Sequence, residues 1–251
     1  MAGHSKWHNI KRRKESQDAK RAKIFTKLSK EIFAAVRESG TDPNTNLRLR
    51  MALTKAKAEN IPNDNIERTI KKAAGESGSV QYEEITYEGY GPGGAAVMVQ
   101  ALTDNKNRSA ADIRHAFTKH GGNLGENGCV SFLFDKKGQL IISRTEDINE
   151  DELMLEAIEA GAEEFESDKE NFFIQTAPEE FENVKQALEE NNFRFSKAEV
   201  TMIPQTYAEV TDEHAEKMLK MIDALEDNDD VQSVYHNFEI NEEQLSRVAY
   251  E

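Results

Sequence analysis

The residue types that most clearly suggest a chemistry are the cations of the first thirty residues. Ten Lys or Arg side chains stand there against two acids, Glu15 and Asp18. Lys and Arg neutralise phosphates, and the ring of Trp7, which lies among them, is able to stack on an unpaired base. The pattern therefore predicts a contact with a nucleic acid. The alternative is a merely solvated segment that keeps the chain soluble.

Two elements must position these cations. Residues 1–16 hold only Trp7 and Ile10 as large apolar side chains, too few to offset the entropy of ordering, so we expect a flexible basic arm. From residue 17 onward, apolar side chains recur at helical spacing and four lysines lie roughly opposite them. The apolar face holds Phe25, Leu28, Ile32 and Val36, and the basic face holds Lys20, Lys23, Lys27 and Lys30. The candidate nucleic-acid contacts are Lys6, Trp7, Lys11, Arg12, Arg13, Lys14, Lys20, Arg21, Lys23, Lys27, Lys30, Arg48 and Arg50.

The charge of the chain is sharply divided along its length. The net charge of −15 would by itself argue against a nucleic-acid ligand. Residues 1–72, however, contain 18 Lys and Arg against 8 Asp and Glu, whereas residues 73–251 contain 14 against 39. The first part attracts a phosphate backbone and the second repels it, so such a ligand meets the protein in one orientation.

Residues 17–76 predict a basic domain of three helices. The first helix ends before Gly40, the second begins at Asp42-Pro43, and the third follows Pro62 and ends at Gly75. We expect the second helix to pack through Leu47, Met51, Leu53 and Ala56. The bundle is compatible with a helix-turn-helix role, but no helix stands out as a recognition helix.

The rest of the chain predicts two α/β domains, one inserted in the other. Residues 135–203 follow the β-α-β-β-α-β order of a ferredoxin-like domain, entered through a turn at Asp135–Gly138 after a strand at Val130–Phe134. Residues 80–134 and 204–240 then form a middle domain around this insertion, and 241–251 form a tail. The predicted fold class is α+β, with the three-helix basic domain preceding the two ferredoxin-like domains.

Composition excludes several classes of protein. The 251 residues are 37% hydrophobic and 31% charged, as in globular domains. The single Cys129 excludes an intramolecular disulfide and a cysteine-based zinc site. No stretch approaches the ~18 apolar residues of a membrane span, and the start lacks the apolar core of a secretory signal. We expect a cytoplasmic protein.

Motifs that resemble catalytic or cofactor sites fail on their context. Gly89–Gly94 matches G-x-G-x-x-G, but a predicted strand follows where the dinucleotide fingerprint needs a helix, and Pro92 removes a donor. His115 and His120 have no carboxylate or cysteine at ligand spacing. No set of nucleophile, base and acid is apparent either. The sequence therefore predicts no enzyme activity, no cofactor and no metal.

A second basic segment, Thr103–Ser109, lies between a predicted strand and a predicted helix. Its polar residues are suited to capping the helix, and equally Lys106 and Arg108 are suited to a second phosphate contact at the helix N-terminus. Tyr90, in the glycine-rich loop, is a further candidate for contact with a macromolecule.

Several long motifs resemble the YebC/PmpR family, and they occur in the order typical of it. They are MAGHSKWHNIKRRK, Asn60-Ile61-Pro62, Tyr87–Gly94, Leu102–Arg108 and Gly121–Gly125. The resemblance spans about residues 1–239 and implies the same three-domain fold and no catalysis. Departures are small: Gln100 stands where an acid is expected, Ser109 where threonine is common, and the tail after Phe238 is extended.

The resemblance implies two functions and the residues leave a third open. The usual family label is a DNA-binding transcriptional regulator. A mitochondrial relative, the translational activator of cytochrome c oxidase subunit I, implies instead an RNA- or ribosome-binding translation factor, acting for example on synthesis stalled at consecutive prolines. A protein–protein adaptor using the acidic domains is the third. A basic arm with one aromatic favours structured RNA. The sequence shows no heptad repeat or dimer face, so we expect a monomer.

Overall fold

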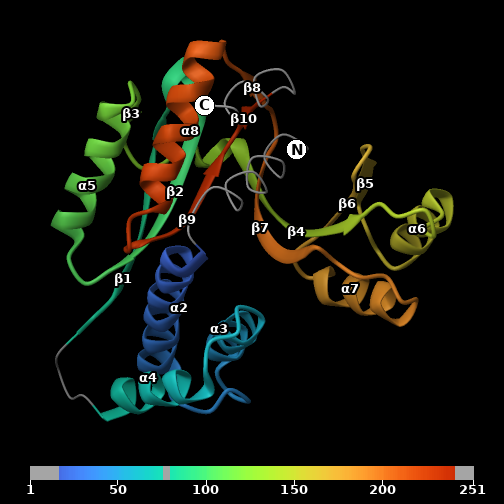
Figure 1. Cartoon of the computed structure of the whole chain (residues 1–251), viewed down its shortest axis with the longest axis horizontal. Coiled ribbons are helices and arrows are strands. Elements are labelled where there is room, and N and C mark those ends of the chain that lie inside the picture. Colours follow the sequence, from blue (N-terminus) through green and yellow to red (C-terminus); the bar gives the residue numbers. More distant parts are fainter. Residues whose placement is uncertain (1–16, 76–79, 241–251) are drawn as a thin grey trace. The chain divides into compact units, whose positions relative to one another are not determined.

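The computed structural model describes residues 17–75 and 80–240, with side chains from Arg21 onward (Figure 1). The predicted basic arm, residues 76–79 and the predicted tail lie outside these described residues. The chain divides into two compact units. Phe132–Tyr207 forms one, and the described residues up to Ser131 together with those from Ala208 form the other.

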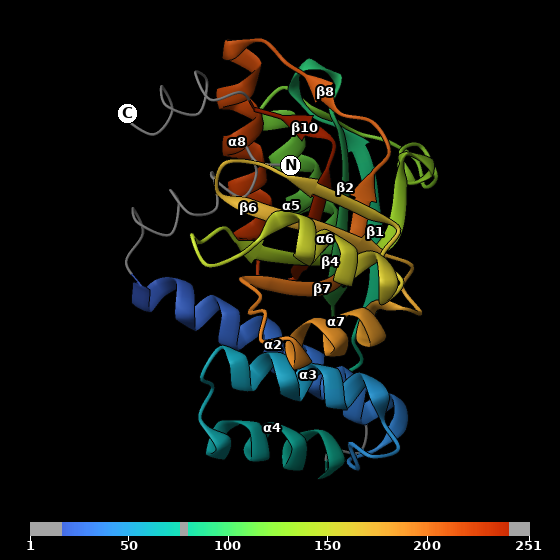
Figure 2. The same cartoon turned by 90° about the vertical axis from the view of Figure 1, so that its right-hand side faces the viewer.

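Three helices begin the described part of the chain, as the apolar periodicity predicts. Helix α2 (Gln17–Ser39) packs against α3 (Leu47–Ala58) and α4 (Asn63–Gly75), and Figure 2 shows the three together. Helix α2 ends where Gly40 adopts φ +87°, a left-handed cap whose N–H donates to the Val36 carbonyl at 2.8 Å. The shared core contains Ile32, Phe33, Ala35, Val36, Leu49, Ala52, Ala56, Ile61, Ile66 and Ala73.

The start and the packing face of α3 differ from the prediction. Asp42 does not cap the helix, because its carboxylate accepts the N–H of Asn44 in a turn. Asn46 is the cap instead: its side-chain oxygen accepts the Leu49 N–H at 2.9 Å. Its amide also donates to the carbonyls of Ala35 and Gly40, which fixes the connection to α2. The predicted packing was therefore wrong for Leu47 and Met51, which are 59% and 49% exposed, while Leu49 is fully buried.

The middle domain is a four-stranded antiparallel sheet with two helices on one face. The strands β1 (Glu83–Tyr90), β2 (Ala96–Thr103), β3 (Asn123–Leu124) and β9 (Val231–His236) lie in the order β3-β1-β2-β9. Helices α5 (Lys106–Lys119) and α8 (Asp212–Glu226) lie side by side against it (Figure 1). Their apolar faces share one core with Val97 and Val99 of β2. A short 3-10 turn, Pro92–Gly94, and the two-residue strands β8 (Ala208–Glu209) and β10 (Phe238–Glu239) complete the domain.

The other unit has ferredoxin-like topology. It consists of β4 (Phe134–Ser143), α6 (Glu150–Glu159), β5 (Glu164–Ser167), β6 (Asn171–Thr176), α7 (Phe181–Glu190) and β7 (Lys197–Pro204). The antiparallel strand order β5-β6-β4-β7 confirms the order expected from the β-α-β-β-α-β pattern. The predicted α+β fold class is confirmed.

The entry into this unit differs from the prediction. Residues Ser131–Leu133 form a 3-10 turn rather than a strand, and β4 runs without interruption through the segment expected to be a turn. The glycine at position 138 is required for packing and not for a turn. A Cβ there would collide with Oγ1 of Thr176 and with the Phe181 ring.

This packing predicts that Gly138→Ala destabilises the Phe132–Tyr207 unit by about 1–3 kcal/mol, because the added methyl group displaces buried neighbours. Chemical denaturation of the full chain measures the effect. Lys136→Ala, an exposed change on the same strand, serves as the control and is expected to shift stability by no more than about 0.5 kcal/mol. Equal stability of the two variants would contradict the packing role of Gly138.

Candidate nucleic-acid interface

The described residues contain only part of the predicted interface. Lys6, Trp7, Lys11, Arg12, Arg13 and Lys14 lie outside them, and Lys20 lies in α2 with its side chain outside them. Six predicted contacts therefore have described side chains: Arg21, Lys23, Lys27, Lys30, Arg48 and Arg50.

The lysines of α2 contact the acidic end of α8 and the loop that follows it. Lys23 forms an ion pair with Asp227 at 2.8 Å, and the Lys27 ammonium donates to the carbonyl of Glu226 at 2.7 Å. A row of cations is complementary to the negative end of a helix dipole as well as to phosphates. Lys23, Lys27 and Lys30, which were predicted to bind phosphate, thus contact the middle domain in this structure.

Lys30 extends this contact to a buried carboxylate. Its ammonium donates to the Asp229 carbonyl at 2.8 Å and pairs with Asp230 at 2.6 Å. The Asp230 side chain is only 5% exposed and also accepts hydrogen bonds from Arg108 and Ser109. Burial alone would raise the pKa of Asp230, but these donors lower it to about 2. Asp230 is therefore ionised at neutral pH and joins α2 to α5.

The three candidates for a second contact do not form one site. Arg108 is bound to Asp104 and Asp230, so its role is structural. The Lys106 side chain is 66% exposed and lies 3.9 Å from Glu83. Tyr90 donates its hydroxyl to the Cys129 carbonyl at the other end of the eight-residue strand β1. The strand length separates Tyr90 from the other two by roughly 20 Å.

Glu88, the residue before the glycine-rich loop, organises a different segment, residues 128–131. The buried carboxylate of Glu88 accepts the N–H groups of Gly128, Val130 and Ser131, each at 2.8 Å. Burial alone would raise the pKa of Glu88, but these three bonds lower it. The G-x-G-x-x-G segment leads into β2, so it presents no helix N-terminus to a pyrophosphate.

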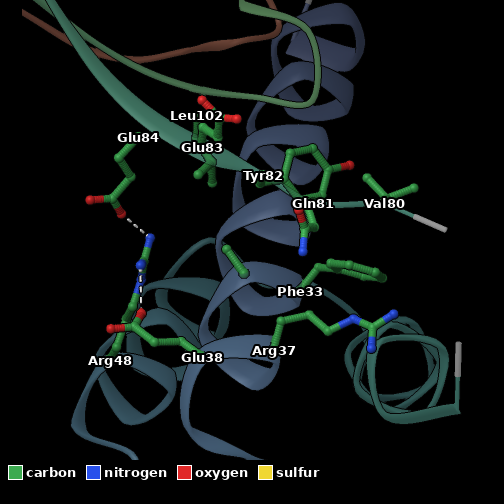
Figure 3. A pocket seen from close by; sticks show the side chains of 11 residues that line it. Phe33, Arg37, Glu38, Arg48, Val80, Gln81, Tyr82, Glu83, Glu84 and Leu102 are labelled. Atoms are coloured by element: carbon green, nitrogen blue, oxygen red, sulfur yellow. Dashed lines mark hydrogen bonds and ion pairs between the residues drawn. The ribbon is translucent and has the colours of Figure 1, made fainter. Parts of the chain in front are cut away.

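Arg48 is held by three carboxylates at the edge of an open pocket. Its guanidinium pairs with Glu31 at 2.9 Å. It also pairs with Glu38 at 2.7 Å and with Glu84 (Figure 3). Burial alone would lower the pKa of Arg48, but the hydrogen bonds to Glu31 and Glu38 raise it above its ordinary value. Surrounded in this way, Arg48 is not available to a phosphate.

The pocket beside Arg48 has a volume of about 630 Å³. The rings of Phe33 and Tyr82 meet edge to face at 5.6 Å, and the Arg37 guanidinium lies 5.6 Å from the Phe33 ring (Figure 3). Glu38, Glu83 and Glu84 also line it. These groups partner one another, and the acids disfavour an anionic ligand, so the pocket does not fit a nucleotide phosphate.

The outer face of α3 is an open basic surface of the bundle. Arg50, Lys55 and Lys57 are exposed there and form no ion pair with any described residue. Helix α3 contains no acid, and Leu47 and Met51 lie exposed among its cations. Arg21 is also exposed, with its guanidinium 5.5 Å from the Phe25 ring. From the sequence, Lys55 and Lys57 extend the basic surface of the bundle, but they were not named as contacts; the acid-free run of twelve residues is the signal that selects them.

Other kinds of site are not formed by the described side chains. Among the residues with described positions, no group of three His, Cys, Asp or Glu is arranged to hold a metal ion. No helix in the described ranges is long and apolar enough to cross a membrane.

The motifs and the fold agree with one protein family. Residues 5–76 match the family model described as "TACO1/YebC protein N-terminal domain", and residues 82–238 match "TACO1/YebC second and third domain". The chain belongs to the TACO1/YebC family. The resemblance inferred from the sequence motifs is thereby confirmed.

Relatives of this TACO1/YebC protein are named as regulators. It is 61% identical to a probable transcriptional regulatory protein of Geobacillus sp. (strain WCH70), over 95% of this chain and 98% of the relative. A protein of the same name from Clostridium novyi (strain NT) is 56% identical, over 97% and 99% of the two chains. The crystal structure of a conserved hypothetical protein from Aquifex aeolicus superposes with a TM-score of 0.78 at 49% identity, covering 90% of this chain and 93% of that one.

The buried position of Asp230 predicts a large effect of its neutralisation. Asp230→Asn removes the charge that Lys30 and Arg108 share, and is expected to lower the free energy of unfolding by roughly 2–4 kcal/mol. Thermal unfolding of the full chain measures this. Asp229→Asn is the matched control, because Asp229 is exposed and Lys30 contacts only its backbone carbonyl. A comparable loss of stability in both variants would contradict this, because any acid in the loop would then have the effect assigned to the buried ion pair.

The pKa of Asp230 also predicts a pH dependence. Because the folded-state pKa, about 2, lies below the ordinary value of 3.8, ionised Asp230 stabilises the fold fully above about pH 4. This stabilisation is lost as the pH falls towards 2. The difference in stability between the wild-type chain and Asp230→Asn should therefore be constant near neutral pH and shrink below about pH 4. Denaturant unfolding across this range measures it, and a difference that persists unchanged at low pH would contradict the assignment.

Proposed function

We propose that this chain is a non-enzymatic regulator of gene expression that binds nucleic acid through its N-terminal three-helix domain. The names of the relatives support the regulatory role, and they favour transcription as the process and DNA as the ligand. The observation that carries the proposal is the outer face of α3, with three open cations and no acid in the helix. Phosphate contacts of this kind supply most of the affinity for a polyanion.

The side chains on the outer face of α3 are suited to phosphates and distinguish few bases. In direct readout Arg or Lys pairs with guanine and Asn or Gln pairs with adenine; α3 presents Arg50, Lys55 and Lys57 but contains no Asn or Gln. The exposed Leu47 and Met51 are apolar and read no hydrogen-bond pattern. This composition favours recognition of shape and charge. It also supports a second candidate, in which the ligand is structured RNA, including RNA of the ribosome, and the regulated process is translation.

The cations divide into two groups in this proposal. Lys23, Lys27 and Lys30 act inside the protein, as their partners at the end of α8 indicate. The basic residues of 1–16, with Trp7 as a stacking ring, act with α3 on the ligand. The contact of these N-terminal residues with the ligand remains a prediction from the sequence.

A double charge reversal tests the α3 surface. We expect Arg50→Glu with Lys57→Glu to weaken binding strongly at low salt, because two phosphate contacts are replaced by two repulsions. The slope of log affinity against log salt should become shallower by roughly two, since each lost contact removes about one unit. Both residues are exposed, so thermal stability should stay unchanged. The measurement uses the full chain with duplex DNA, duplex RNA and single-stranded RNA as separate ligands.

The matched control makes the same change of net charge elsewhere. Lys136→Glu with Lys169→Glu reverses two exposed lysines of the Phe132–Tyr207 unit. Equal losses in the two variants would show that only net charge matters and would overturn the assignment to α3. Preferential binding of RNA by the wild-type chain would select the translational candidate over the transcriptional one.

A further inference from the structure

Helix α5 is basic although it belongs to the acidic part of the chain. Residues 106–120 contain four Lys or Arg and a single acid, Asp112, whereas residues 73–251 as a whole contain 14 Lys and Arg against 39 Asp and Glu. A local excess of cations in so acidic a background is not a consequence of average composition. It marks one surface of the middle domain as different from the rest.

The cations of α5 fall into two groups according to their partners. At its start, Arg108 is bound by Asp104 and Asp230, and Lys106 lies near Glu83. In its second half Arg114, His115 and Lys119 are exposed, and within the described ranges none of them forms an ion pair. The second half of the helix therefore carries charge that the fold does not use.

The geometry of the helix spreads these charges over a surface. At 100° per residue, Arg114 and Lys119 project about 140° apart, with the short side chains of Ala111 and Thr118 between their directions. Ile113, Ala116 and Phe117 form the opposite, buried face, which packs into the core of the middle domain. The outer face is thus a shallow strip of small residues bordered by cations, open to an extended ligand.

The end of α5 brings further basic groups together. His120, at this end, has a lowered pKa, first because of its burial and then because of its basic neighbours Lys119, Lys220 and His115. Lys220 is itself paired with Glu216 on α8. Among the described residues, Lys119 and His115 are thus the groups here that form no ion pair.

We propose that the second half of α5, with Arg114, His115 and Lys119, is a second contact for a nucleic-acid backbone, separate from the outer face of α3. The proposal rests on the proposed function and adds a contact surface to it. The cations diverge along a helix face and do not converge on a point, which suits an extended chain of phosphates better than a single small anion. A membrane surface is disfavoured, because the strip has no large exposed apolar side chain to insert into lipid.

The decisive variant reverses the two strongest charges of this surface. Arg114→Glu with Lys119→Glu, in the full chain, should weaken binding roughly ten- to hundredfold at low salt, and should make the salt slope shallower by roughly two. Arg114→Gln with Lys119→Gln should show a smaller loss in the same direction, because it removes the contacts without adding repulsion. Duplex RNA and duplex DNA are the probes, and unchanged thermal unfolding establishes that the variants are folded. The control pair is again Lys136→Glu with Lys169→Glu.

The pattern across the three reversals separates this inference from the proposed function. Losses in both the α3 and the α5 variants, beyond that of the control, support two contact surfaces. A loss in the α3 variant alone, with the α5 variant equal to the control, overturns the second contact and leaves the proposed function standing. Absence of binding by the wild-type chain to either probe rejects both. Protection of the peptide 106–120 from hydroxyl-radical labelling on addition of nucleic acid is the direct readout, and unchanged labelling there would also overturn the inference.

Discussion

The arrangement of the three-helix domain and the middle domain depends on the hydrogen bonds and ion pairs of one ionised side chain, Asp230. This buried carboxylate receives Lys30 from α2, Arg108 and Ser109 from α5, and the Thr103 hydroxyl from the end of β2. An isolated charge in such a position would be strongly destabilising, so the donors from all three elements must be in place together. The bundle is held against the sheet because its own lysine completes this site.

That constraint decides which charges face outward. Lys23, Lys27 and Lys30 of α2 are directed to the end of α8 and the residues that follow it. Among the described residues, the cations that form no ion pair include those on the outer face of α3, Arg68 of α4, and Arg114 and Lys119 in the second half of α5. In the proposed function, cations with the same chemistry therefore have two roles, one in holding the domains together and one in binding the ligand. The division follows from the position of acidic partners and not from the number of positive charges.

Local patterns predicted most of the fold, and contacts distant in sequence account for most of what they missed. Helical spacing and the cap at Gly40 located α2, and the strand and helix order predicted the ferredoxin-like unit. The role of the α2 lysines was not predictable, because Lys30 and Asp230 are 200 residues apart. The turn expected at Asp135–Gly138 does not form, and the reason is similar. Position 138 needs glycine because of Thr176, which lies on another strand. At α3 the signal was local, but Asn46 competed successfully with Asp42-Pro43 as the helix cap.

The two ends of the ferredoxin-like unit lie next to each other. Its first and last strands, β4 and β7, pair from Phe134 opposite Pro204, and the Gln205 N–H donates to the Leu133 carbonyl at 2.9 Å. The two points at which the chain enters and leaves are thus adjacent. A segment with its ends together fits into a surface loop of a host domain without separating the host strands, and is removable by joining the two ends directly. Adjacent ends are also the geometry that circular permutation of such a unit requires.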